Sequence, residues 1–168
     1  AKLDSNLYEE VEADKSALGQ AMAIVVLSSI AAGIGLYKTG GFSGIITGTM
    51  GSLISWYVWA YLTYFIGTKF LPEPQTQADL GELLRTIGFS SSPGLLRVFY
   101  FVPGIGVLLY LISSLWMLVA MIIAVRQALD YNSTLRAVGV CVIGYIIQIF
   151  ILVLILSIFG GVNPDSVA

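Results

Sequence analysis

The chain has 168 residues, of which 57% are apolar types and 11% are charged, with eight basic and ten acidic side chains. Soluble domains usually carry about 25% charged residues, so these charges are too few to cover a soluble surface of this size. The net charge of −2 and the absence of a basic cluster argue against a nucleic-acid partner. We therefore expect an integral membrane protein whose main partner is the lipid bilayer.

Reactive side chains are scarce. The sequence has no histidine, which is the commonest general base and metal ligand, and its one cysteine, Cys141, lies in an apolar run. No phosphate-binding loop, nucleophile elbow or metal-ligand spacing occurs. We expect no catalytic residue, no metal site and no cofactor, and hence a protein that is not an enzyme.

Residues 1–16, AKLDSNLYEEVEADKS, form an acidic segment that we expect on the cytoplasmic side. Asn6 and Glu9 have the spacing of a capping box, which predicts a short amphipathic helix from about Leu7. Leu7, Val11 and Leu18 would share one face of that helix.

Three uncharged stretches have the length of about 20 residues that a membrane helix needs. They are residues 17–36, 45–66 and 137–159. Aromatic side chains gather toward one end of the second stretch, which places that end near the headgroups. Residues 160–168 form a polar C-terminal tail, so the transmembrane domain covers residues 17–159.

Residues 67–92 are mostly polar, and Pro72 and Pro74 interrupt any helix there. Asp79 can cap a short amphipathic helix that would lie on the membrane surface, with Glu82 and Arg85 facing water.

The stretch from residue 93 to residue 125 is too long for one membrane span and short for two. A helix in this stretch can be interrupted at Pro103 and Gly104. With four spans, five basic residues lie on the side of the N-terminus and three on the opposite side. With five spans, six lie on the side of the N-terminus and one on the opposite side, and Arg97 lies within the third segment. Basic residues favour the cytoplasmic side, so we predict five membrane-embedded helices, the third short (93–102) and the fourth at 106–126. The N-terminus would be cytoplasmic and the C-terminus outside. A surface position for residues 93–104 stays open.

The stretch AVRQALDYNSTLRAVGV, residues 124–140, is then a cytoplasmic turn. Arg126 and Asp130 are one helical turn apart and can pair. Asn132, Ser133 or Thr134 can cap the following helix, and Arg136 can anchor at the interface. The Asn-Ser-Thr acceptor pattern for glycosylation is discounted on the cytoplasmic side.

Small residues at three- and four-residue spacing predict close helix packing. These candidates are Ser28, Ala32, Gly35, Gly44, Gly48, Ser52 and Ser55. The polar side chains expected within the membrane are Arg97 and Gln148, the latter as an interhelical hydrogen-bond donor or, alternatively, as a pore-lining residue.

Three stretches resemble the Yip family, prokaryotic-type members in particular. They are LYEEVEAD, GELLRTIGFSSSPGLLRVFYFVPGIG and WMLVAMIIAVRQALDYNSTLRAVGVCVIG. The resemblance covers nearly the whole chain. It implies a five-span helical domain with a cytosolic N-terminus, here in a bacterial inner membrane. Eukaryotic relatives resemble adaptors in vesicle traffic that bind small GTPases. The N-terminal region of this chain is short by comparison, which puts GTPase binding in doubt.

Three functions fit these observations. The first is a non-enzymatic scaffold or accessory subunit that contacts other membrane proteins, or a second copy of itself, through its helices. The second is a transporter or channel for a small solute or lipid, which a continuous polar cavity would favour. The third is an intramembrane enzyme, which the scarcity of reactive side chains disfavours most. The resemblance adds a membrane-trafficking adaptor, as in eukaryotic relatives.

Overall fold

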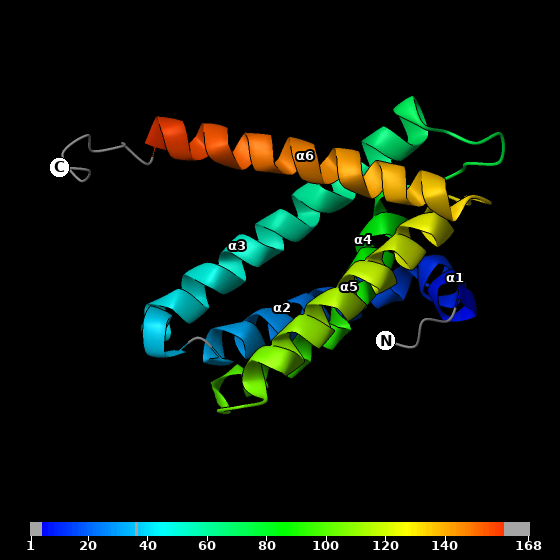
Figure 1. Cartoon of the computed structure of the whole chain (residues 1–168). Helices are drawn as coiled ribbons and strands as arrows, with labels where there is room; N and C mark the ends of the chain where they lie inside the picture. The colour runs from blue at the N-terminus through cyan, green and yellow to red at the C-terminus, as the bar shows by residue number, and fades with distance from the viewer. Residues whose placement is uncertain (1–4, 36, 160–168) are drawn as a thin grey trace.

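The computed structural model describes residues 5–35 and 37–159, and every regular element in these ranges is a helix (Figure 1). Three elements are not α-helical: the 3-10 helices η1 (Lys15–Ala17) and η3 (Ser92–Phe101), and the π-helix η2 (Ile66–Phe70). The α-helices are α1 (Ser5–Ala13), α2 (Leu18–Gly35), α3 (Tyr37–Phe65), α4 (Leu80–Ser90), α5 (Gly106–Ala128) and α6 (Thr134–Phe159). The prediction of an all-α fold is confirmed for these residues, whereas the predicted tail, 160–168, lies outside them.

Local signals in the sequence set several helix ends. The predicted Asp79 cap is confirmed: its carboxylate accepts from the backbone N–H of Glu82, and the Glu82 side chain accepts from the N–H of Asp79. The predicted break after residue 102 is also present, with Gly104 in the left-handed region at φ 87°. Gly41, at φ 59°, interrupts α3 near its start.

Within the described ranges, three helical segments are long and apolar enough to cross a bilayer: Lys15–Gly35, Gly106–Ala128 and Thr134–Leu154. The prediction of five membrane-embedded helices is wrong on this measure. Helix α3 has 29 residues, but its glycine, threonine, serine, tryptophan and tyrosine side chains lower its hydropathy. The ten residues of η3 rise about 20 Å at roughly 2 Å each, less than the hydrocarbon thickness of about 30 Å.

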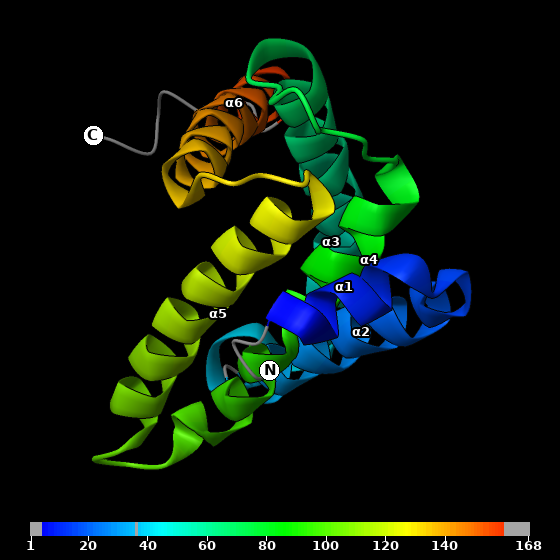
Figure 2. The same ribbon diagram turned by 90° about the vertical axis from the view of Figure 1, so that its right-hand side faces the viewer.

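Helix α4 lies inside the bundle, which corrects the prediction of a helix on the membrane surface. It packs against α1, α2, α3 and α5, and η3 continues from it between α2 and α5 (Figure 2). Leu83 is fully buried, and Arg85 is only 5% exposed instead of facing water. The neighbouring helices therefore cover the polar face that the sequence pattern assigned to solvent.

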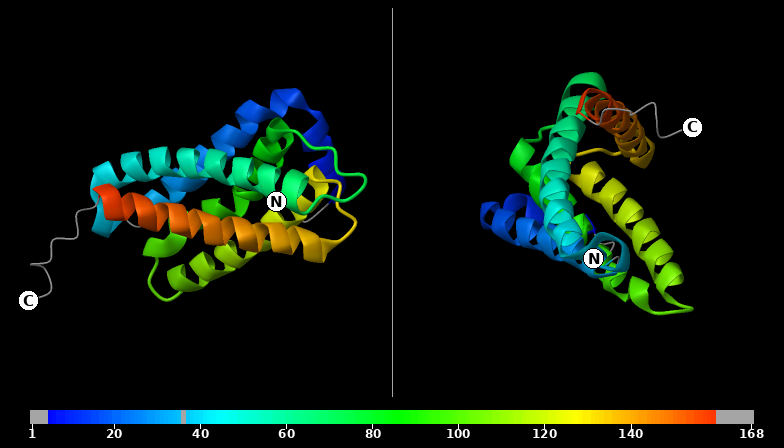
Figure 3. Two further views of the ribbon diagram at one scale, coloured as in Figure 1. Left: turned by 90° about the horizontal axis from the view of Figure 1, so that it is seen from above. Right: turned by 90° about the vertical axis from the view of Figure 1, so that its left-hand side faces the viewer.

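The packed core lies toward the end of the bundle that carries α1 and the two connections 71–79 and 129–133. Trp56 Nε1 donates to the Leu84 carbonyl at 3.1 Å and joins α3 to α4 there. Other buried core residues come from the first half of α2, the ends of α3 and α5, and the first turns of α6; they include Val25, Trp59, Val125, Ala137 and Val140. Helices α5 and α6 meet at this end and diverge away from it (Figures 2 and 3).

Candidate functional site

The connection 71–79 is fixed against the turn between α5 and α6. The Tyr131 hydroxyl lies 2.7 Å from the Leu71 carbonyl oxygen and 3.0 Å from that of Gly67. The Glu73 carboxylate accepts from the backbone N–H of Asn132 at 2.9 Å and pairs with Arg136 Nε at 3.4 Å. The hydrogen bond from Asn132 lowers the pKa of Glu73, and Arg136 lowers it further. This polar turn therefore has an architectural role.

The predicted pair between Arg126 and Asp130 does not form. Helix α5 ends at Ala128, so Asp130 is not one helical turn beyond Arg126; it adopts φ 52° and its carboxylate faces the Gln77 N–H at 3.4 Å. Arg126 instead donates to the carbonyls of Tyr131 at 3.1 Å and Asn132 at 3.2 Å.

The cap of α6 and the interfacial arginine are also placed by the structure. The Ser133 hydroxyl faces the N–H of Arg136 at 3.4 Å, so Ser133 is the capping residue and Thr134 is the first residue of α6. Arg136 Nη1 donates to the Pro72 carbonyl at 2.6 Å, in addition to its pair with Glu73. Arg136 therefore ties α6 to the connection 71–79.

Helix α1 is held to the same end by polar contacts. Arg85 donates from Nε to the Val11 carbonyl at 3.2 Å and from Nη2 to the Glu12 carbonyl, and Gln127 Nε2 donates to Glu9 Oε1 at 2.9 Å. Beside these contacts is a cavity of about 750 Å³ with four carboxylates, from Glu9, Glu12, Glu82 and Asp130. Burial, and then the charges of Glu82 and Asp130, raise the pKa of Glu12 to about 7.

The acidic cavity has no arrangement that would hold a metal: within residues 5–35 and 37–159, no group of three or more histidine, cysteine or acidic side chains is suitably placed. The arginine that lines it, Arg126, and Arg85, which contacts α1, are both engaged with backbone carbonyls. These groups therefore position α1 and the turn.

A second cavity, of about 410 Å³, lies in the less densely packed half of the bundle, between α2, α3 and η3. The structure places most of the predicted small residues around it. Its lining includes Ser28, Ala32, Gly44, Gly48, Ser52 and Arg97.

The predicted small residues of α2 and α3 differ in how closely another helix approaches them. A Cβ at Gly35 would overlap the Arg97 carbonyl oxygen, so α2 and η3 do approach closely there. At Gly44 and Gly48 a Cβ would meet no atom within 4 Å, which corrects the expectation of close packing. The reason is that α2 contacts α3 elsewhere, with Ile45 against Gly33, and leaves open space above the two glycines.

A third cavity, of about 300 Å³, adjoins the second. The two share Ser52, Ser91 and Met117. Ser55 and the half-buried Gln148 line this third cavity. No hydrogen bond from Gln148 to another helix is present in the described part of the chain, so its predicted interhelical role is not seen.

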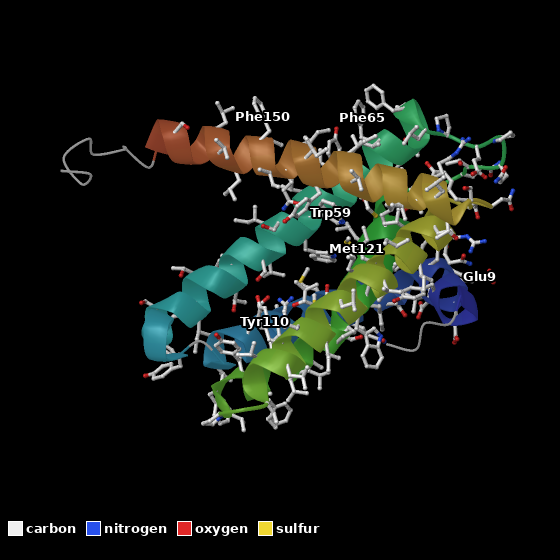
Figure 4. All side chains as sticks on the ribbon, in the orientation of Figure 1. Glu9, Trp59, Phe65, Tyr110, Met121 and Phe150 are labelled. Atoms are coloured by element: carbon white, nitrogen blue, oxygen red, sulfur yellow. The ribbon has the colours of Figure 1, made fainter. Side chains whose placement is uncertain are left out.

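An apolar groove of about 510 Å³ follows the divergence of α5 and α6. Trp59 and Met121 lie at its inner side, between α3 and α5 (Figure 4). The remaining lining comes from α5 and α6 and consists of Leu118, Ile122, Val138, Cys141, Val142, Tyr145 and Ile146. Both of these helices belong to the three segments that can cross a bilayer, so the groove opens toward the lipid or toward another membrane protein.

Sequence reasoning missed several residues that organise these sites. Glu73 and Tyr131 lie in segments interpreted as solvated loops, and their partners are distant in sequence. Gly88 is also important, because a Cβ there would lie 2.7 Å from the Cβ of Ala21. The available signal was Gly88 itself, a small residue between Ile87 and Phe89, because small residues let helix backbones approach closely.

Comparison with known proteins identifies the family. The Yip1 domain matches residues 5–159, from the start of α1 to the end of α6. The chain belongs to the Yip1 domain family. The resemblance in the sequence is thereby confirmed. The comparisons of this chain with curated proteins and with solved structures found no match.

Proposed function

We propose that this Yip1 domain protein is a non-enzymatic scaffold or accessory subunit that receives a transmembrane helix of another membrane protein in the groove between α5 and α6. The observation that carries the proposal is the groove itself. Its walls are apolar and come mainly from two helices that can span a bilayer. Among the described residues no charged side chain lines it, which favours an occupant with a mainly apolar surface.

A helix suits this groove better than a single lipid chain. The α6 wall runs from Val138 to Ile146, about 12 Å at 1.5 Å per residue. The residues toward the turn, Val138, Cys141 and Val142, have shorter side chains than Tyr145 and Ile146 farther along α6. Tyr145 and Trp59 provide a broad aromatic contact farther along, with ring centroids 6.5 Å apart.

The proposal of a non-enzymatic protein is supported by how the polar groups are used. At the α1 end, Arg85, Arg126 and Arg136 donate to backbone carbonyls. A catalytic site would instead direct such groups at a shared position in a cavity.

Placement in a bacterial inner membrane, with the α1 end cytoplasmic, is part of the proposal. Arg85, Arg126, Arg136 and Lys69 all lie toward this end, and basic residues favour the cytoplasmic side. A role as a trafficking adaptor is the family-level alternative. The GTPase binding of eukaryotic relatives is not part of our proposal.

The test is purification in a mild detergent followed by native mass spectrometry. We expect a companion membrane protein in stoichiometric amount with the wild type. Val142→Trp fills the groove and should release the companion. Val153→Trp is the matched control, because Val153 is similarly exposed on α6 but does not line the groove. A lone 18.1 kDa wild-type species, or equal retention by both variants, would contradict the proposal.

A further inference from the structure

Arg97 carries a charge that the described part of the chain does not neutralise. It lines the cavity between α2, α3 and η3, and the one ion pair among the described residues is Arg136–Glu73, at the other end. Its Nη2 donates to Ser114 Oγ at 3.1 Å, and its guanidinium carbon lies 5.0 Å from the centre of the Tyr110 ring. Its Nε is buried without a hydrogen-bond partner. Arginine has five N–H donors, and among the described residues the guanidinium donates one hydrogen bond, to Ser114.

The cavity around Arg97 offers room and no competing negative charge. Its volume is about 410 Å³, within the usual range for small-molecule sites. Besides Arg97, its polar lining among the described residues consists of serine hydroxyls, including Ser28, Ser29 and Ser52, and no carboxylate of these residues lines it. The open space above Gly44 and Gly48 is part of the same cavity.

The adjoining cavity extends this space in an apolar direction. It begins at the shared residues Ser52, Ser91 and Met117. Beyond them its walls include Trp56, Trp59, Ile87, Leu118 and Met121. The combined space is therefore cationic at one end and mostly apolar at the other, which fits a ligand with an anionic head and a hydrocarbon chain.

We propose that the two cavities bind an anionic phospholipid, with its phosphate on Arg97 and part of an acyl chain along the apolar walls. The planar guanidinium can donate two parallel N–H bonds to phosphate oxygens. A headgroup without an ammonium is preferred, because no carboxylate of residues 5–35 and 37–159 lines either cavity to pair with one. The head of the lipid lies toward the end of the bundle opposite α1, since Arg97 contacts the end of α2 at Gly35.

The assay is native mass spectrometry of the full chain in mixed detergent micelles that contain phosphatidylglycerol or phosphatidylcholine. We expect the wild type to retain phosphatidylglycerol preferentially. Arg97→Gln should reduce this retention roughly tenfold or more, because it removes charge-assisted hydrogen bonds. Arg97→Lys should give an intermediate value, since it keeps the charge and loses the planar donor pair. Lys69→Gln is the control for net charge, because Lys69 is exposed at the other end.

If Arg97→Gln does not fold, a second variant that changes the cavity and not Arg97 still tests the proposal. Gly48→Leu leaves Arg97 in place and adds a side chain to the cavity lining, at a position where a Cβ meets no atom within 4 Å. It should lower retention of phosphatidylglycerol while the melting temperature in detergent stays at or above that of the wild type. Equal retention in the wild type and Gly48→Leu, or in the wild type and folded Arg97→Gln, would overturn the proposal. Displacement of the lipid by an equal concentration of inorganic phosphate would also overturn it, since the site would then select a free anion.

Discussion

Arg85 of α4 donates its Nε hydrogen bond to the Val11 carbonyl oxygen of α1 at 3.2 Å. The two residues are 74 positions apart, and both are buried. A single buried arginine therefore holds the C-terminal end of α1 against the packed end of the bundle.

Removal of this contact should release α1. With Arg85→Met, two backbone carbonyls lose their donor, and we expect a loss of about 1–3 kcal/mol in the free energy of unfolding. Hydrogen exchange should become faster in residues 8–13 and stay unchanged in α5. Lys15→Gln, at an exposed position, is the control. Unaltered exchange in α1 of Arg85→Met would contradict this role of the arginine.

Docking of α1 should also depend on pH. The pKa of Glu12 rises from 4.5 to about 7 because of burial and then the carboxylates of Glu82 and Asp130, with Arg85 acting in the opposite direction. The folded state then binds more protons than the unfolded state between these values, so stability falls as the pH rises from about 4.5 through 7. Glu73 does not obscure this window, because its pKa is lowered below 4.5.

The measurement is hydrogen exchange of α1 at several pH values, corrected for the intrinsic rate. We expect protection in the wild type to decrease between pH 5 and 7.5. Glu12→Gln should flatten this dependence, since the amide does not titrate. A slope that persists in Glu12→Gln would assign the pH effect to another group.

Tyr131 should be the residue that fixes the polar turn. Burial raises its pKa to about 12, so the hydroxyl stays protonated and can donate to Leu71 or Gly67 at neutral pH. Tyr131→Phe should lower the free energy of unfolding by about 1–3 kcal/mol. Tyr57→Phe, at a side chain that is 53% exposed on α3, should have almost no effect in the same denaturation assay.

Two glycines that share a predicted packing role should respond in opposite directions. Gly35→Ala forces a Cβ against the Arg97 carbonyl and should destabilise the fold by about 1–3 kcal/mol. Gly48→Ala meets open space within α3 and should stabilise it by up to about 1 kcal/mol through helix propensity. Thermal unfolding in one detergent compares both with the wild type, and changes of the same sign would contradict the geometry.

Helix ends could be predicted from the sequence where they depend on residues that are adjacent in the chain. The Asp79–Glu82 capping box and the break near Gly104 each depend on a few adjacent residues, and both are present. The burial of Arg85 could not be predicted, because its acceptors are carbonyls of a distant helix and carry no side-chain pattern. The same limit applies to Glu73, whose partners Asn132 and Arg136 lie in a separate turn.

The membrane segments show a different limit. Charge counting favoured a short third helix, but a count of basic residues does not reveal that η3 continues from α4 between α2 and α5. Small-residue spacing predicted close packing at Gly44 as readily as at Gly35. The difference arises because only Gly35 lies against another backbone, which is a property of the tertiary arrangement.

Photo-cross-linking in intact membranes tests the scaffold role most directly. A photoreactive phenylalanine analogue replaces Tyr145, which lines the groove, or Phe150, which is exposed on α6 outside it. We predict a cross-link from position 145 to one membrane protein, lost on Val142→Trp, and only lipid adducts from position 150. Lipid adducts alone at both positions would contradict the account.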